Sequence, residues 1–227
     1  EYKIECGTDN DCRTNFSCDK GKCAEKQNTA SASIPLFQTE NTVVKEINDV
    51  SEIKDFLLQE SKKQLNADQF KRIVFIDKKS NKEIGLKDFF GAIGVKASDE
   101  FFQRLGDYFT FFIYNQSQGN RIGFAVKIND YTGFEAIMKK EELFLEEKYA
   151  PFFSLLTADF LQKNKIFKNA SAIKSYTGPN FRYKILTNRD VGFYYLPSSQ
   201  NYFVFTTSWA SMEKTIGKLG ITENLSK

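Results

Sequence analysis

The sequence predicts an α+β protein: an antiparallel sheet covered on one face by helices, preceded by a small N-terminal module that disulfide bonds hold together. Three observations carry this prediction. All four cysteines lie between residues 6 and 23. Apolar residues alternate with other residues along a segment near the middle of the chain, which is the pattern of a half-buried strand. The predicted helices gather between runs of predicted strands, and this order is typical of α+β domains.

The cysteines define the first module, residues 1–26. Cys6, Cys12, Cys18 and Cys23 are separated by turn-forming residues, and a segment of this length has no hydrophobic core. It folds only if it is cross-linked, and each of two bonds would stabilise it by about 3 kcal/mol. Four cysteines allow three pairings. We favour Cys6 with Cys18 and Cys12 with Cys23, because interleaved loops give the more compact knot.

Metal ions are the alternative interpretation of this segment. Structural zinc sites usually take their thiolates from cysteine pairs with two to four intervening residues, and the five-residue gaps here are longer. Asp9 and Asp11 suggest calcium, but Arg13 stands where a calcium loop would need a third ligand. We therefore predict disulfide bonds, with no metal ion and no cofactor.

A linker is predicted over residues 27–35, because this stretch is small and polar and ends at Pro35. The α+β domain is then residues 36–227. A domain of this size buries about 70% of the surface of its unfolded chain, so it needs no covalent cross-links of its own. The 23 phenylalanines and 10 tyrosines of the chain are expected mainly in its core.

The first half of this domain alternates between strands and helices. Asp49 and Glu52 have the spacing of a capping box, which predicts a helix start. Gly94 and Gly106 follow short apolar segments, as glycines often follow helix ends. The predicted strands are 42–47, 70–76 and 82–85, and the predicted helices are 49–65, 86–94 and 98–106.

The clearest signal is a hairpin formed by residues 108–114 and 121–128. In its second strand, every other residue is a large apolar one: Ile122, Phe124, Val126 and Ile128. A period of two means that one face of the hairpin is buried.

The last third is rich in strands. A helix is predicted over 134–148 and is broken by Pro151, and a second, buried helix follows at 152–161. Ser208 then caps a closing helix, in which apolar residues have helical spacing. Short turns between the strands require antiparallel pairing. The predicted strands are 166–175, 181–186, 191–197 and 202–208.

The composition excludes several classes of chemistry. The chain contains no histidine, so neither a histidine-dependent catalytic dyad or triad nor a histidine-ligated zinc site can be built within it. A net charge of +3, evenly mixed along the chain, does not indicate a nucleic-acid partner. No run of 18 apolar residues occurs, so we expect no membrane insertion within this chain.

Two groups of polar residues have both a catalytic and a structural explanation. Ser211 and Lys214 have the Ser-x-x-Lys spacing of penicillin-recognising enzymes, but the companion elements are absent and helix capping explains the hydroxyls. Four glutamates could supply paired acids, but they lie on a helix interleaved with lysines, and helix-surface ion pairs explain them: Glu141, Glu142, Glu146 and Glu147. We predict no catalytic residue.

Four aromatic residues of the C-terminal third form the candidate binding surface: Tyr194, Tyr195, Tyr202 and Trp209. Tyrosine suits sugar and protein partners, because it joins a flat apolar ring to a hydroxyl. Packing in the core is the favoured alternative, since aromatic residues in strands are usually buried.

Short motifs in the hairpin and in the last strands carry a family resemblance. The residues that match are Arg121, Gly123, Lys127, Ile128, Arg182, Tyr183, Thr206, Thr207, Ser208, Ser211 and Met212. Through them, the chain from about residue 105 to 219 resembles uncharacterised exported or membrane-anchored proteins of candidate-phyla (Patescibacteria-type) bacteria. The resemblance implies a cell-surface domain behind an N-terminal membrane anchor and implies no catalytic residues.

The cysteine-rich segment carries a second resemblance. Through Asp9, Asp11 and Cys12 it is similar to the short four-cysteine repeats of secreted proteins. This similarity implies an extracellular compartment and paired cysteines, but no activity.

Together these features predict an extracellular or cell-surface protein without catalytic activity, which contacts a protein or a glycan. An anchor preceding Glu1 fits this prediction, and the sequence does not specify an oligomer. One alternative is a histidine-independent hydrolase of envelope polymers that uses carboxylates or lysine. Another is a structural surface or assembly subunit that pairs through a sheet edge. Two facing carboxylates in a cleft, with raised pKa values, would favour the hydrolase, whereas an exposed aromatic strand face would favour recognition.

Overall fold

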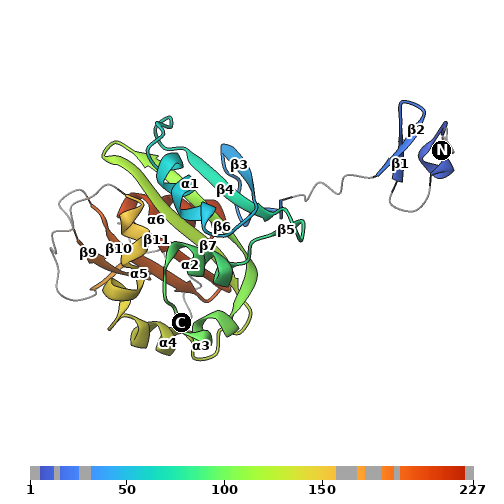
Figure 1. The fold of residues 1–227 in the computed structure, drawn as a ribbon. Coiled ribbons are helices and arrows are strands. Elements are labelled where there is room, and N and C mark those ends of the chain that lie inside the picture. Colours follow the sequence, from blue (N-terminus) through green and yellow to red (C-terminus); the bar gives the residue numbers. More distant parts are fainter. Residues whose placement is uncertain are drawn as a thin grey trace. The chain divides into compact units, whose positions relative to one another are not determined.

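The computed structural model describes residues 6–12, 16–25, 32–156, 168–171, 180–186 and 190–222 (Figure 1). The chain divides into two compact units, residues 1–31 and residues 32–227, and each is considered by itself. The first unit contains all four cysteines, and the second contains the large sheet.

The N-terminal unit is a hairpin preceded by a short helical turn. Strands β1 (Phe16–Asp19) and β2 (Lys22–Glu25) pair antiparallel, and the 3-10 helix η1 (Asp9–Asp11) precedes them. Lys20 and Gly21 join the strands with φ angles of 49° and 80°. Two consecutive positive φ angles are typical of the type I′ turn, whose twist matches that of a hairpin.

The main unit is built on a mixed sheet with the strand order β3-β4-β6-β7-β11-β10-β9-β8, and the short β5 pairs with β4. β3 and β4 are parallel because helix α1 (Glu52–Glu60) connects them as a crossover, whereas the other described strand pairs are antiparallel. The strands are β3 (Asn41–Ile47), β4 (Phe70–Asp77), β5 (Lys82–Glu83), β6 (Leu105–Gln116), β7 (Gly119–Ile128), β8 (Lys168–Ser171), β9 (Asn180–Ile185), β10 (Gly192–Ser198) and β11 (Tyr202–Thr206).

The helices confirm the predicted α+β class. Five of them contribute buried side chains to one face of the sheet, where aromatic rings such as Phe111, Phe124 and Phe205 form the larger core. These are α1, α2 (Leu86–Ile93), α3 (Asp99–Gln103), α4 (Phe134–Glu141) and α5 (Leu145–Ser154) (Figure 1).

Helix α6 (Trp209–Leu219) lies on the other face of the sheet, which differs from the predicted placement of all helices on one face. There Met212 and Ile216 pack with residues that alternate with those of the larger core, such as Tyr194 and Val204. The strands β10 and β11 are apolar on both faces, so both faces need a covering layer.

Gly123 marks a close approach of neighbouring strands within this sheet. A Cβ atom at this position would lie 2.5 Å from Cζ of Phe112 and 2.6 Å from the main-chain oxygen of Phe205. Only glycine therefore fits at this position of β7, between the neighbouring strands β6 and β11.

Several predicted helices differ in their boundaries. The helix predicted over 49–65 ends at Glu60, and the one predicted over 98–106 ends at Gln103, before β6 begins at Leu105. The segment predicted as a single helix over 134–148 forms α4 and α5, and Pro151, predicted to break the helix, lies inside α5. Proline removes one helical hydrogen bond, which costs about 3 kcal/mol. Tyr149, Phe152 and Phe153 around it are fully buried, and this burial outweighs the loss. The start of the predicted helix 152–161 belongs to α5, and its residues 157–161 lie outside the described residues, as do both ends of the predicted strand 166–175.

The main unit begins before the predicted boundary. Ser33 lies in the predicted linker, yet its carbonyl oxygen accepts a 2.6 Å hydrogen bond from Arg72 and its main-chain nitrogen donates to Glu83 over 2.8 Å. Phe37 follows and packs edge-on against Phe70 and Phe112. The buried guanidinium of Arg72 requires polar partners, and residues 32–35 supply some of them.

Candidate functional site

Two of the four candidate surface aromatics are buried, which agrees with the favoured alternative of core packing and not with an exposed strand face. Tyr194 is 0% exposed and Tyr195 is 1% exposed, and they belong to the cores on opposite faces of the sheet. The hydroxyl of Tyr194 donates to Asp190 over 2.7 Å, and that of Tyr195 donates to Glu142. Burial and these carboxylates raise the pKa of both phenols far above the ordinary value. β10 is an interior strand with layers on both faces, so its alternating rings are covered.

Tyr202 and Trp209 are partly exposed, but they serve local packing. The ring of Tyr202 lies 5.8 Å from the ammonium of Lys127. Trp209 packs edge-on against Phe181 and Tyr183, with ring centroids 4.9 and 5.6 Å away. The four predicted residues therefore do not form one recognition surface.

The serine and glutamate groups have structural roles. Ser211 is fully buried, its main-chain nitrogen donates to the hydroxyl of Ser208, and Ser208 caps α6 as predicted. Glu141 pairs with Lys148 at 2.9 Å. Glu142 accepts a bidentate pair of hydrogen bonds from Arg182, at 2.6 and 2.7 Å. Capping and ion pairing account for these residues.

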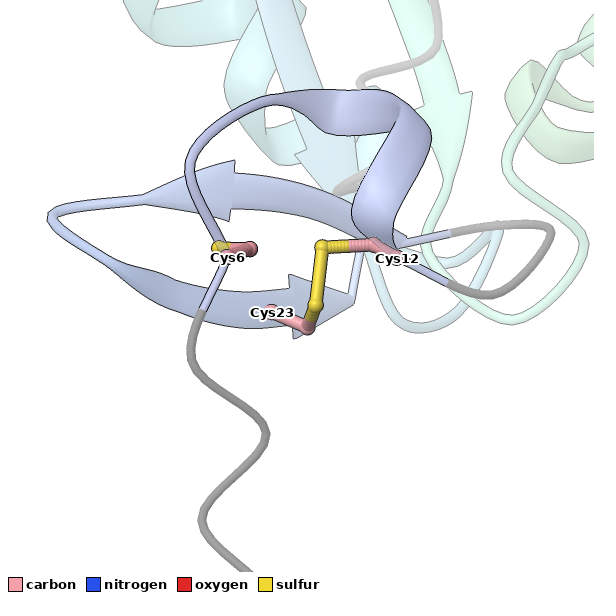
Figure 2. Close-up of side chains that lie close together, drawn as sticks. All are labelled: Cys6, Cys12 and Cys23. Atoms are coloured by element: carbon pink, nitrogen blue, oxygen red, sulfur yellow. A yellow bond between two sulfur atoms is a disulfide. The ribbon is translucent and has the colours of Figure 1, made fainter.

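The four cysteine sulfurs are consumed by two disulfide bonds. Cys6 pairs with Cys18 and Cys12 with Cys23, which is the pairing favoured from the sequence. Figure 2 shows Cys6 beside the Cys12–Cys23 bond, and the sulfur atoms of these three residues lie within 4.8 Å of one another. This proximity resembles a thiolate metal site, but oxidised sulfurs carry no thiolate charge to bind zinc.

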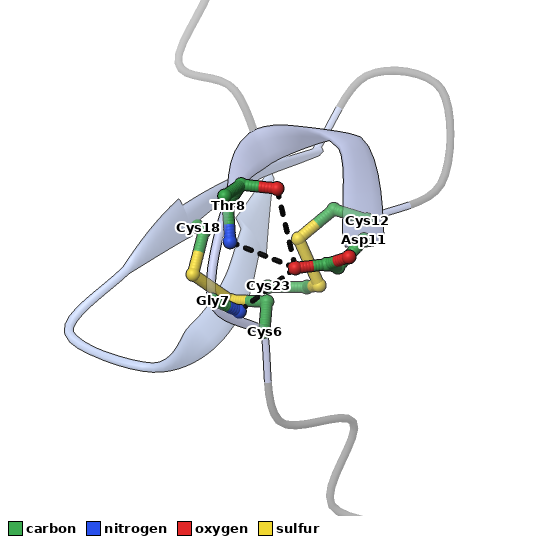
Figure 3. The surroundings of a disulfide bond; sticks show 7 residues. All are labelled: Cys6, Gly7, Thr8, Asp11, Cys12, Cys18 and Cys23. Carbon is green, nitrogen blue, oxygen red and sulfur yellow. Dashed lines mark hydrogen bonds between the residues drawn. A yellow bond between two sulfur atoms is a disulfide. The ribbon is translucent and has the colours of Figure 1, made fainter.

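Asp11 caps the turn next to these disulfides (Figure 3). Its Oδ2 atom accepts hydrogen bonds from the main-chain nitrogens of Thr8 and Gly7, at 2.8 and 2.9 Å, and from the hydroxyl of Thr8. These donors, the Thr8 nitrogen first, lower the pKa of Asp11 below its ordinary value. The turn-capping role accounts for Asp11, whose carboxylate oxygen Oδ2 is occupied by N–H and O–H donors.

The strongest candidate site is a cavity of about 520 Å³ at the tip of the β6–β7 hairpin, here called the hairpin cavity. Four stretches of chain line it: residues 61–65, which follow α1, residues 115–121 of the hairpin, Leu155 with Leu156 after α5, and Val191. Its volume falls within the range of small-molecule sites.

Hydrogen bonds fix the walls of the hairpin cavity to one another. The side-chain nitrogen of Asn120 donates to the main-chain oxygens of Ser61 and Lys63, at 2.7 and 2.8 Å. Asn115 donates to Oδ1 of Asn120 over 2.8 Å. The hydroxyl of Ser61 donates to the main-chain oxygen of Leu155 over 2.7 Å. The first three of these stretches therefore form one pre-organised frame, which is the condition for binding without a large ordering cost.

Part of the cavity lining is rich in amide side chains, and another part is apolar. Gln64, Ser117 and Gln118 are exposed, and their side chains make no hydrogen bond with another described residue. Leu155, Leu156 and Val191 are buried and supply apolar lining. Such a site offers both donors and acceptors beside a surface that favours C–H groups.

The sequence pattern missed this site. The segment "NQSQGN" (115–120) signals a hairpin turn, and the segment "SKKQL" (61–65) signals only a polar stretch. About 50 residues separate these segments, so only the pairing of β4 with β6 brings them together. An unusually amide-rich hairpin turn is the one local sign that could have been noticed.

Two further cavities lie elsewhere on the main unit. A cavity of about 270 Å³ lies against α4, β9 and β10 and is lined by Tyr195, Arg182 and Pro197 among others. One of about 640 Å³ is lined mainly by α2, α3 and the start of β6. Tyr195 and Arg182 are occupied by Glu142, so the smaller cavity offers fewer available polar groups than the hairpin cavity.

The carboxylate pKa values bear on the hydrolase alternative. Where a carboxylate pKa is clearly shifted, it is lowered: at Asp11, Glu40, Asp49, Glu52, Glu60, Asp77 and Asp99. At Asp77, the hydroxyl of Ser80 is the main cause. A general acid needs the opposite shift, because it must stay protonated near neutral pH.

Comparison with known proteins assigns no family to this chain. No protein-family model matches it, and no curated protein or solved structure is significantly similar to it. The resemblance to exported bacterial proteins and to four-cysteine repeats therefore stays a prediction. Across the described part of the chain, every helix is too short or too polar to cross a membrane.

Proposed function

We propose that this protein is an exported, non-catalytic recognition protein whose main unit binds a glycan in the hairpin cavity. The observation that carries the proposal is the frame itself: a concave site of about 520 Å³ whose walls are hydrogen-bonded together and whose exposed side chains include the amides of Gln64 and Gln118 and the hydroxyl of Ser117, beside two lysines. Of the two partner classes expected from the sequence, this shape and chemistry favour a glycan.

The match to a sugar rests on hydrogen-bond capacity. Each sugar hydroxyl donates and accepts, and each amide of Gln64 and Gln118 does the same. The C–H faces of a sugar ring are apolar, and the lining by Leu155 and Leu156 suits them. Binding then needs no movement of the main chain, because Asn120 already fixes the hairpin to residues 61–63.

Export is proposed from the N-terminal unit. Disulfide bonds form and persist outside the reducing cytosol, and this unit has two of them. Display at a cell surface would place the hairpin cavity among envelope or matrix polysaccharides. A hydrolase of such polymers remains the alternative from the sequence, and the lowered carboxylate pKa values favour binding over it.

The test is calorimetric titration of the oxidised protein with soluble oligosaccharides that represent common envelope polysaccharides. We expect saturable binding of at least one, which the double substitution Gln64→Ala with Gln118→Ala weakens at least fivefold. Gln59→Ala is the matched control, because Gln59 is exposed on α1 and does not line the cavity. The proposal fails if no oligosaccharide binds, or if the double variant binds as the unchanged protein does.

A further inference from the structure

The apolar lining of the hairpin cavity is aliphatic and small in area. Although the chain has 23 phenylalanines and 10 tyrosines, none of them is among the described lining residues. Three of the aliphatic lining side chains, Leu155, Leu156 and Val191, are only 1%, 7% and 2% exposed. A flat aromatic ring would cover the whole face of a sugar ring, whereas these side chains match an apolar group of about the size of a methyl group.

This aliphatic lining is joined directly to the amide-rich walls. The hydroxyl of Ser61 donates to the main-chain oxygen of Leu155 over 2.7 Å, which connects the stretch after α5 to the turn that carries Gln64. The side chain of Asn120 connects the same turn to the hairpin that carries Gln118. A ligand in the cavity therefore meets amide groups and a small apolar surface together.

Side-chain amides recognise other amides in a complementary way, because each has both a donor and an acceptor. The wall of the cavity contains one such pair, in which the amide nitrogen of Asn115 donates to Oδ1 of Asn120 over 2.8 Å. The side chains of Gln64 and Gln118 are exposed and make no hydrogen bond with another described residue. Their donors and acceptors are therefore available to an amide group of a ligand.

We infer that the hairpin cavity selects an N-acetylated saccharide over one that carries only hydroxyls. This inference rests on the proposed function and narrows its ligand class. An acetamido group combines an N–H donor, a carbonyl acceptor and a methyl group within one small substituent. Its amide binds the amides of Gln64 and Gln118, and its methyl group contacts the aliphatic lining at Leu155 and Leu156. A hydroxyl at the same position of the sugar supplies no methyl group and leaves the aliphatic lining without a partner.

The experiment compares chitin tetrasaccharide with cellotetraose in calorimetric titrations of the oxidised protein. The two ligands have the same linkage and differ only in the acetamido group or hydroxyl at C2. Both are uncharged, so Lys62 and Lys63 do not cause a difference between them. We expect the chitin tetrasaccharide to bind at least tenfold more tightly, because a methyl group leaves water and an amide gains hydrogen bonds. A third arm, a peptidoglycan-type tetrasaccharide in which every second acetamido sugar carries a lactyl ether, distinguishes the two polymers that supply this group.

Two variants test whether the preference arises in the cavity. The double substitution Gln64→Leu with Gln118→Leu keeps the size of both side chains and removes their hydrogen-bonding groups, so the preference for the acetamido ligand should fall below about threefold. Gln59→Leu is the matched control and should keep the preference, because Gln59 is exposed on α1 and does not line the cavity. Circular dichroism melting curves verify folding, and the comparison of ligands on the unchanged protein tests the inference without any variant.

The outcomes separate this inference from the proposed function. Equal binding of chitin tetrasaccharide and cellotetraose overturns the inference and leaves glycan binding intact. A preference that persists in the double variant overturns it too, because the selectivity then arises outside the hairpin cavity. If neither acetamido ligand binds but another oligosaccharide does, the inference is wrong and the proposed function stands. If no oligosaccharide binds at all, both are wrong.

Discussion

The two units of this chain reach a fixed structure by different means. Of the side chains described in the N-terminal unit, only Cys6 is buried, and two disulfide bonds connect η1 and the hairpin. The main unit is described from residue 32 and contains no cysteine, but its sheet is filled on both faces by aromatic rings. The ring of Phe124, for example, has four other phenylalanine rings within 6 Å, measured between ring centroids.

The difference follows from size. A short segment cannot bury enough apolar surface to offset the conformational entropy of folding, so cross-links that restrict its unfolded state replace a core. The larger unit buries that surface and needs no cross-link. The stability of the two units should therefore respond to different perturbations, and four measurements test this distinction.

The largest effect is expected for Phe124→Ala in the main unit. This side chain is fully buried between layers, so its removal leaves a cavity and should lower the free energy of unfolding by about 3–5 kcal/mol. Chemical denaturation followed by tryptophan fluorescence reports on the main unit, because Trp209 is the sole tryptophan. Proton spectra of the cysteine-rich unit should not change, and a change there would show that the units depend on each other.

The double substitution Cys12→Ser with Cys23→Ser perturbs only the N-terminal unit. It removes a bond that spans 11 residues and about 3 kcal/mol of stability, which should unfold this unit. Limited proteolysis should then cleave within residues 1–31, while the melting temperature of the main unit stays within about 1 °C. A lower melting temperature of the main unit would contradict the separation. Cys12→Ser alone is unsuitable as a control because it leaves a free thiol.

The third prediction concerns a buried ion pair of the main unit. Glu60 and Lys71 are both nearly inaccessible, so Glu60→Gln leaves a buried ammonium without its counter-charge and should cost about 2–3 kcal/mol at neutral pH. Burial opposes ionisation of Glu60, but hydrogen bonds from Lys63 and Lys71 outweigh it and lower the pKa below the ordinary 4.5.

The sign of the pH dependence follows from that lowered pKa. The contribution of Glu60 is complete above the pKa of the unfolded chain and is lost as the pH falls through the lower pKa of the folded state. Denaturation curves from pH 6 down to about 3 should therefore converge for Glu60→Gln and the unchanged protein. Glu100→Gln, an exposed substitution on α3, is the control. A difference that persists at the lowest pH would show that lost packing is the cause.

The smallest effect is expected for deletion of residues 1–31. Main-unit contacts begin with Ser33, which binds Arg72 and Glu83, so this deletion should shift the melting temperature by less than about 1 °C. Deletion of residues 1–38 is the comparison, because it also removes Phe37 from its contacts with Phe70 and Phe112 and should destabilise the main unit clearly. Equal melting temperatures for the two deletions would show that residues 32–38 contribute nothing.

The local features of the fold were predictable from the sequence alone. Turn residues between closely spaced cysteines predicted cross-links, and alternation from Ile122 to Ile128 predicted the hairpin strand, because these signals depend on neighbours along the chain. The cap of α6 by Ser208 was predictable for the same reason. The absence of histidine excluded whole classes of chemistry without any structure.

Which side chains are exposed, and where a cavity forms, depends on the tertiary structure. Tyr194 and Tyr195 are residues of the type found in binding faces. However, β10 is an interior strand with layers on both sides, so both rings are buried. Pro151 lies within a helix because the burial of its neighbours outweighs one lost hydrogen bond. The hairpin cavity depends on segments 61–65 and 115–121, which are distant in sequence and meet only through strand pairing. Periodicity records how a segment relates to its own neighbours, whereas a cavity depends on long-range contacts that no single segment encodes.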